Sequence, residues 1–193
     1  MTNKKDLNFE TKVIHAGQKS DPTTGAVMTP IVLASTYEQS SPGIHKGYDY
    51  SRSINPTREA FENCIASLEN GIKGYGFSSG VAAISACVEL LSPGDHIIAM
   101  DDLYGGSVRL FNEIKSISQG IEVTYVDMTD IDNVKNSLKE STKMIFVETP
   151  TNPLLKIADL SKIAKLAKAN KILTVCDNTF ASPYNQQPLN HEI

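Results

Sequence analysis

Beyond residue 55, short runs of consecutive apolar residues alternate with stretches in which apolar residues recur every three or four positions. The runs predict strands buried on both faces, and the spaced pattern predicts helices with one buried side. The predicted strands are 75–77, 96–100, 121–126, 144–147 and 172–176. The predicted helices are 81–91, 107–117, 131–139 and 159–169, after a first helix that starts at Pro56, behind the cap Asn55, and stops near Gly71. This alternation predicts an α/β fold with a mostly parallel sheet sandwiched by helices.

The first part of the chain has no strong helical or strand period. It is rich in Thr, Ser, Gly, Pro and Lys, which favours an extended, partly ordered arm. An arm this long needs a surface to lie on, and we expect a neighbouring subunit to provide it. The predicted organisation is an arm at 1–54 followed by one large domain at 55–193.

The composition favours a globular protein that needs no disulfide or metal to fold. Of 193 residues, 40% are hydrophobic, and 18 Lys and Arg against 22 Asp and Glu give a net charge of −4. This mild acidity argues against a nucleic-acid surface, which needs a basic patch. No apolar run approaches the ~20 residues of a membrane span, and the N-terminus lacks the apolar stretch of a signal peptide. We therefore expect a cytoplasmic protein with no nucleic-acid or membrane partner.

The cysteines and histidines support the same compartment and give no metal site. Cys64, Cys87 and Cys176 are far apart, odd in number and embedded in apolar stretches, which predicts reduced, buried thiols. The four histidines show no ligand spacing, so we expect no protein metal site.

Polar side chains gather directly after four of the predicted strands. The groups are residues 78–80, 101–104, 148–153 and 177–179. In open α/β sheets, ligands bind outside the carboxyl ends of the strands, so parallel alignment would bring these groups to one edge. Each group alone is also explained as a turn or a helix cap, but four at successive strand ends indicate a site.

Ser79 and Gly80 open a predicted helix whose free N–H groups and dipole favour an anion such as phosphate. An ordinary serine cap beside a tight glycine turn explains the same two residues. Glycines at 74, 76 and 80 are one position off the dinucleotide-binding fingerprint, and no acidic residue follows at the required place. A dinucleotide-dependent oxidoreductase is therefore the weaker alternative.

Asp177 ends the most apolar predicted strand, where a carboxylate is costly to desolvate without a positive partner. That partner is either a Lys or Arg, or the protonated ring nitrogen of pyridoxal phosphate, which such enzymes pair with an acidic residue. Tyr104, on a glycine-rich loop at the same edge, is placed either to stack on a flat ring or to pack as a half-buried aromatic.

Taken together, these stretches resemble the Cys/Met-metabolism family of pyridoxal-phosphate enzymes, which includes cystathionine γ-synthase, γ-lyase and β-lyase and methionine γ-lyase. The matching segments, in family order, are T-K-V-I-H-A-G from Thr11, Y-S-R-S-I-N-P-T-R from Tyr50, S-S-G from Ser78, D-L-Y-G-G from Asp102, E-T-P-T-N-P from Glu148 and D-N-T-F from Asp177. The resemblance implies an aspartate-aminotransferase-like large domain of fold type I, here incomplete, and pyridoxal 5'-phosphate as cofactor.

The resemblance also implies which groups bind the cofactor phosphate. Gly80 and Val81 would donate backbone N–H groups to it, and Ser79 belongs to the same set. Tyr50 and Arg52 would reach across a dimer interface to the neighbouring subunit's phosphate. Arginine suits that task because its planar fork of donors is always charged. A homo-oligomer, a dimer of dimers, is the implied assembly.

Around the cofactor ring, the resemblance implies a second set of residues. Tyr104 would stack on the pyridine ring and assist proton transfer, and Asp177 would keep the ring nitrogen protonated. Asn152 would bind the ring hydroxyl oxygen. Glu148 would support the same cluster, and Thr179 completes the predicted cofactor-binding residues.

The chain departs from the family pattern where the aldimine lysine is concerned. That lysine lies beyond Asp177 in a Ser-x-Thr-Lys motif, and the sequence stops at Ile193 before reaching it. The run 141–143 looks similar but precedes a predicted strand, so we interpret it as a solvated turn. We expect the N-terminal half of a longer enzyme, inactive alone and completed by further sequence or a separate chain.

The implied activity is carbon–sulfur bond chemistry on sulfur amino acids in transsulfuration, acting on cystathionine or on O-acyl-homoserine plus cysteine. Gly106 stands where methionine γ-lyases typically carry cysteine, so the γ-synthase and γ-lyase branches are favoured. Two alternatives stay open: a noncatalytic fragment that needs a complementary chain, and the dinucleotide-dependent oxidoreductase.

Overall fold

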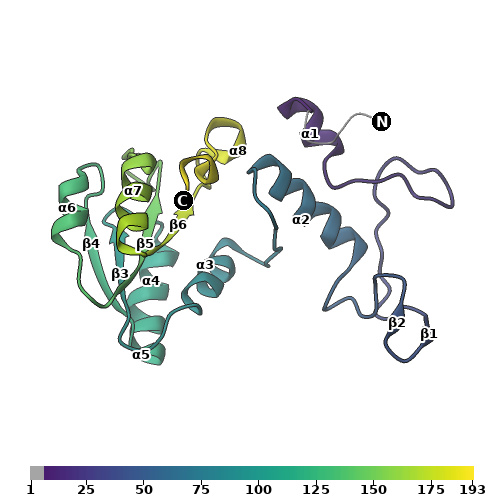
Figure 1. Cartoon of the computed structure of the whole chain (residues 1–193), viewed down its shortest axis with the longest axis horizontal. Coiled ribbons are helices and arrows are strands. Elements are labelled where there is room, and N and C mark those ends of the chain that lie inside the picture. Colours follow the sequence, from purple (N-terminus) through teal and green to yellow (C-terminus); the bar gives the residue numbers. More distant parts are fainter. Residues whose placement is uncertain (1–6) are drawn as a thin grey trace. The chain divides into compact units, whose positions relative to one another are not determined.

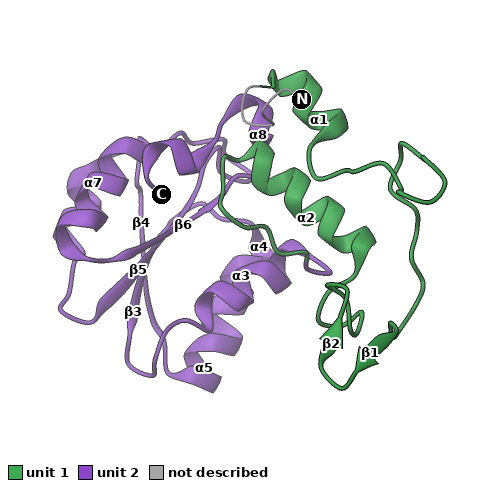
Figure 2. Cartoon of the chain, turned by 45° about the vertical axis from the view of Figure 1, so that its right-hand side comes forward, with its two compact units in different colours: residues 1–76 green, residues 77–193 purple. Residues whose placement is uncertain are grey.

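The computed structural model describes residues 7–193, which divide after Gly76 into two compact units (Figures 1 and 2). The division after Gly76 groups the helix at 56–68 with the N-terminal segment. The part of the expected arm at 1–6 lies outside the described residues, and the assignment of 1–54 as an arm on another subunit stays a prediction.

In the first unit, regular structure is short and separated by irregular backbone. It comprises α1 (Phe9–His15), the antiparallel pair β1 (Gln39–Ser41) and β2 (Ile44–His45), and α2 (Pro56–Leu68). Asn55 caps α2 as predicted, since its side chain accepts hydrogen bonds from the next helical amides. The sequence did not predict α1, which buries none of its residues, or the small hairpin.

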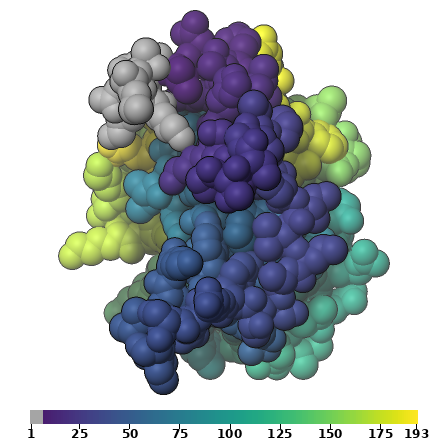
Figure 3. Space-filling view, turned by 90° about the vertical axis from the view of Figure 1, so that its right-hand side faces the viewer, coloured from purple at the N-terminus to yellow at the C-terminus, as the bar shows by residue number. Residues whose placement is uncertain are grey.

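Hydrogen bonds tie the irregular backbone to the start of α2. Thr57 Oγ1 accepts from Val32 N (2.9 Å) and donates to Pro30 O (3.1 Å), and Asn55 Nδ2 donates to Val32 O (3.0 Å). Neighbouring apolar side chains are nevertheless exposed, Ile31 to 80% and Leu33 to 90%. Figure 3 shows one face of this unit in purple to blue.

The second unit contains a four-stranded sheet in which every neighbouring pair is parallel. Its order is β4 (Glu122–Val126), β3 (His96–Met100), β5 (Thr142–Glu148) and β6 (Leu173–Asp177). The predicted parallel α/β sheet is therefore confirmed. In register, Glu148 lies beside Asp177, so these two strands end at the same level.

Helices cover both faces of this sheet (Figures 1 and 2). On one side lie α3 (Gly80–Val88) and a continuous helical segment made of α4 (Gly105–Arg109), the π-helical turn η2 (Leu110–Lys115) and α5 (Ser116–Gln119). On the other lie α6 (Ile131–Asn136) and α7 (Leu160–Asn170). The chain closes with α8 (Ser182–Asn185) and the 3₁₀ turn η3 (Pro188–His191). Gly120 ends α5 with φ of 65°, as the predicted helix break requires.

The core forms where the central strands meet these helices. All five residues of β3 are buried, and Phe111 packs edge-to-face on Phe146 with ring centroids 5.2 Å apart. His96 is also fully buried, and its two ring nitrogens lie 2.8 Å from Thr142 Oγ1 and Thr124 Oγ1. One imidazole therefore links three adjacent strands.

Two local expectations are wrong. Residues 75–77 form no strand, because this segment packs against α2. Gly76 N donates to Glu62 Oε1 (2.8 Å), and Gly74 lies so close to the Glu62 carbonyl that a side chain there would overlap it. The run 141–143 is not a solvated turn, since β5 already begins at Thr142, which is buried.

The cysteines are free thiols, as predicted, although all three are only partly buried. Across residues 7–193, no helix combines the length and apolar character that crossing a bilayer demands.

Candidate active site

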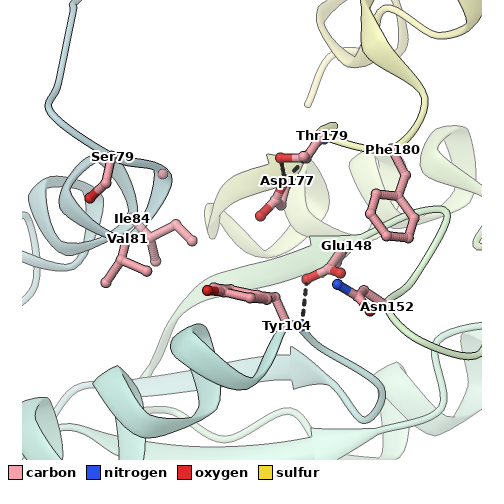
Figure 4. Close-up of a pocket in the computed structure, with 10 residues that line it drawn as sticks. Ser79, Val81, Ile84, Tyr104, Glu148, Asn152, Asp177, Thr179 and Phe180 are labelled. Carbon is pink, nitrogen blue, oxygen red and sulfur yellow. Dashed lines mark hydrogen bonds between the residues drawn. The ribbon is translucent and has the colours of Figure 1, made fainter.

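A cavity of about 380 Å³ opens at the carboxyl edge of the sheet in the second unit (Figure 4). It is lined by Ser79, Gly80, Val81, Ile84, Tyr104, Glu148, Asn152, Asp177, Thr179 and Phe180. The structure thus brings together eight of the ten site residues that the sequence predicts. Ile84 and Phe180 were not predicted, although Phe180 directly follows the segment that carries Asp177.

One end of the cavity is the start of α3. The Ser79 hydroxyl accepts from Ala82 N (3.2 Å), so this side chain caps the helix as well as lining the cavity. The amides of Gly80 and Val81 precede the first intrahelical donor and have no acceptor within the described chain. A β-carbon at Gly80 would meet no atom within 4 Å, so the space beside the helix start is open.

The floor of the cavity is the ring of Tyr104, which is 47% exposed (Figure 4). Tyr104 precedes α4, and its backbone N–H donates to Glu148 Oε2 at 3.0 Å. Glu148 is the last residue of β5, so this bond joins the end of β5 to the loop after the neighbouring strand β3. It fixes the backbone from which the Tyr104 ring projects.

Asp177, the last residue of β6, directs its carboxylate into the cavity (Figure 4). Its Oδ1 accepts from Thr179 N (3.0 Å) and Thr179 Oγ1 (2.5 Å). Among residues 7–193 no Lys, Arg or His forms an ion pair with it. The intramolecular cation that would explain this carboxylate without a ligand is therefore absent from the described residues.

Glu148 lies deepest among the acidic groups of the cavity, with 4% exposure. Burial raises the pKa of its carboxyl group, and the negative charges of Asp177 and Asp102 act in the same direction. The amides of Tyr104 and Asn152 oppose the shift by stabilising the ionised form.

Tyr50 and Arg52 lie in the first unit. The Arg52 guanidinium is 5.0 Å from the centroid of the Tyr50 ring, a cation–π contact that leaves both side chains on the surface. Their expected reach to a neighbouring subunit's phosphate stays a prediction.

The cavity meets the requirements of a flat, phosphorylated heteroaromatic ligand. Free amides and open space at Gly80 suit a phosphate, the exposed Tyr104 ring suits an aromatic face, and the Asp177 carboxylate suits a protonated ring nitrogen. These three features border one cavity of a size typical for small ligands. The residues present therefore fit pyridoxal phosphate.

The fold and this cavity define an α/β domain with its ligand site at the carboxyl edge of a parallel sheet. The family model for Cys/Met metabolism PLP-dependent enzymes matches residues 10–193, and the chain belongs to that family. Members of this family depend on pyridoxal phosphate.

Individual relatives agree with the family match. The chain is 56% identical to a cystathionine β-lyase of Coxiella burnetii over 187 residues, which cover 97% of this chain and 48% of the relative. It is 48% identical to a cystathionine γ-lyase of Bacillus subtilis, covering 95% of the chain and 48% of the relative. The chain therefore spans about half the length of the curated relatives it matches.

A solved structure extends the similarity to three dimensions. The crystal structure of a cystathionine γ-lyase from Lactobacillus plantarum complexed with L-serine matches with a TM-score of 0.93 and 48% identity. The match covers 97% of this chain and 49% of that chain.

Proposed function

We propose that this chain provides the pyridoxal-phosphate cavity of an enzyme that makes or breaks carbon–sulfur bonds in amino acids. The observation that carries the proposal is that the α3 start, the Tyr104 ring and the Asp177 carboxylate, which forms no ion pair among the described residues, converge on one cavity. Neither a purely structural role nor a dinucleotide site accounts for all three groups together.

Each wall of the cavity has its own task in this proposal. The amides of Gly80 and Val81, with the Ser79 hydroxyl beside them, would hold the phosphate at the positive end of α3. Tyr104 would cover the ring and exclude water from it, and Asn152 would bind the ring hydroxyl. Thr179 orients the Asp177 carboxylate through two hydrogen bonds.

Asp177 is the electrostatic centre of the proposed mechanism. Its carboxylate would hold a proton on the ring nitrogen and so keep that nitrogen positive. Pyridoxal phosphate, when bound, would supply an electron sink for the α-carbon of an amino-acid substrate. The Tyr104 hydroxyl, at the same cavity, would assist proton movement near the reacting carbon.

The substrate class follows from the relatives. Proteins named for cystathionine β-lyase, γ-lyase and γ-synthase activity all match nearly the whole chain. We therefore assign the whole protein to cystathionine cleavage or synthesis, the latter from O-acyl-homoserine and cysteine. Tyr50 and Arg52 would complete the phosphate site of a neighbouring subunit in a homo-oligomer.

The test is a titration of the purified chain with pyridoxal 5'-phosphate, followed by absorbance and tyrosine fluorescence. Because no lysine between residues 7 and 193 lines the cavity, we expect one saturable site from which dialysis removes the cofactor. Pyridoxal, which lacks the phosphate, should bind at least about tenfold more weakly, a difference of about 1.4 kcal/mol. Equal binding of the two compounds, or saturable binding of NADH instead, would contradict the proposal.

A further inference from the structure

Among the links between the loops that carry Tyr104 and Asn152, two carboxylates accept hydrogen bonds from amides of the opposite loop, in opposite directions. Glu148, at the end of β5, accepts from Tyr104 N in the loop after β3 (3.0 Å). Asp102, in the loop after β3, accepts through Oδ2 from Thr151 Oγ1 (2.5 Å) and Leu154 N (2.9 Å) in the loop after β5. Each loop therefore supplies a carboxylate to the other.

These bonds hold the backbone beside Asn152 and Tyr104, two residues that line the cavity. Thr151 and Leu154, the two donors to Asp102, lie on either side of Asn152 in the chain. Thr151 is fully buried, and its hydroxyl oxygen also accepts from Lys156 N (2.8 Å), which closes the loop on itself. On the opposite loop, Tyr104 itself provides the amide that Glu148 binds.

We infer that Asp102 and Glu148, which we call the carboxylate pair, are positioning residues that fix Tyr104 and Asn152 relative to one another across the cavity. Loss of either carboxylate then loosens both loops, not only the loop that it contacts. The ligand side of this inference rests on the proposed function, whereas the coupling of the loops does not.

The geometry indicates that Asp102 acts as a hydrogen-bond acceptor for the opposite loop. The Asp102 charge opposes ionisation of the nearby Glu148, so it does not stabilise the other carboxylate of the pair. Both donors converge on one oxygen, Oδ2, and an asparagine amide oxygen has two lone pairs for the same two donors. Asp102→Asn should therefore keep most of the function that Asp102→Ala loses.

The first experiment needs no cofactor and measures amide hydrogen exchange of the full 193-residue chain by NMR. In Asp102→Ala we expect the Leu154 amide to exchange at least about tenfold faster, and the Tyr104 amide to be accelerated as well. Asp102→Asn should restore protection at both amides. The matched comparison is Asp101→Ala, because the Asp101 side chain also joins the two loops, through the Lys156 side chain, but it binds neither of these amides.

The second experiment follows pyridoxal 5'-phosphate binding and the circular dichroism that the cavity induces in the bound cofactor. Asp102→Ala should weaken binding about three- to tenfold and reduce the induced signal, with recovery in Asp102→Asn. Thr151→Val preserves the shape of this buried residue and removes the hydroxyl that donates to Asp102, together with the acceptor of Lys156 N, so it tests the same link if Asp102→Ala does not fold.

The inference is overturned if Asp102→Ala, or Thr151→Val in its place, accelerates the Leu154 amide while the Tyr104 amide keeps its protection. It is equally overturned if Asp101→Ala reproduces the effect on Tyr104. If the unaltered chain binds no pyridoxal phosphate, the proposed function fails, and amide exchange still decides whether the carboxylate pair couples the loops.

Discussion

The ring of Tyr104 occupies the space that a side chain on Gly106 would need. A β-carbon at position 106 would overlap Cε1 of Tyr104 and come within 3.1 Å of Val81 Cγ2. Gly106 is buried inside α4, where glycine costs a helix about 1 kcal/mol relative to alanine. Glycine at position 106 therefore leaves the space that the Tyr104 ring occupies.

Gly106→Ala should displace the Tyr104 ring and weaken pyridoxal-phosphate binding by about tenfold, because the displaced Tyr104 ring would no longer contact the ring of the cofactor. Gly105→Ala is the matched control, since a β-carbon at Gly105 would meet no atom within 4 Å and alanine favours the helix. Cofactor titration of both variants measures the effect. Equal affinities in the two variants would show that Gly106 has no role in placing the ring.

Asp177→Asn should lower cofactor affinity by about ten- to a hundredfold, since a hydrogen bond to a charged group contributes about 1.5–3 kcal/mol. The variant keeps the shape of the side chain but loses the negative charge that faces the ring nitrogen. Asp132→Asn, on the exposed surface of α6, should bind like the unaltered chain. A cofactor spectrum and affinity unchanged in Asp177→Asn would exclude this carboxylate as the ring partner.

Glu148 should make the chain less stable as pH rises. Burial first, and then the neighbouring carboxylates, raise the folded-state pKa above the ordinary value of 4.5, so between the two values the folded state binds more protons than the unfolded state. The free energy of unfolding therefore falls as pH rises from 4.5 to the raised pKa. Glu148→Gln should lack this decline in urea unfolding measured across that range.

The control for this pH series is Glu140→Gln, at an exposed position. It should follow the pH profile of the unaltered chain. Parallel profiles for Glu148→Gln and the unaltered chain would mean that Glu148 ionises in the folded protein as it does in the unfolded one.

His96 should make the chain more stable as pH rises, the opposite of the effect of Glu148, and should do so in a higher pH range. Desolvation first, and then the positive charge of Lys139, lower the pKa of this buried imidazole below 6.5, although Glu122 opposes the shift. The unfolded state then binds more protons than the folded state, so stability is present above pH 6.5 and is lost as pH falls towards the lowered pKa.

His96→Gln should lack that acid loss in urea unfolding curves, while being less stable at neutral pH. The exposed His15 offers the control, since His15→Gln should keep the acid loss. If His96→Gln shows the same dependence below pH 6.5, another group accounts for it.

The sequence predicted the sheet and its helices because each buried element has its own local pattern. The strand at 96–100 was placed to the residue, and the helix at 159–169 differs from α7 by one residue at each end. The parallel strand ends then predicted where the cavity would lie. The individual cofactor-binding roles came from family resemblance and stay predictions.

What the sequence did not reveal depends on contacts between distant residues. Residues 75–77 have the apolar character of a strand, but Glu62 of α2 takes the hydrogen bond of Gly76. The link from Asp102 to Thr151 joins positions 49 apart, and no local pattern distinguishes this carboxylate from a turn residue. The overlap between positions 104 and 106 also became apparent only from atomic positions.

The side-by-side register of β5 and β6 makes the site sensitive to strand length. Each added residue advances a strand by about 3.3 Å and turns its side chains to the opposite face of the sheet. One insertion within β5 would therefore carry Glu148 out of reach of the Tyr104 amide and out of line with Asp177. Insertions and deletions between homologous sequences should accordingly fall in the loops at the amino edge of the sheet, where none of the residues that line the cavity lies.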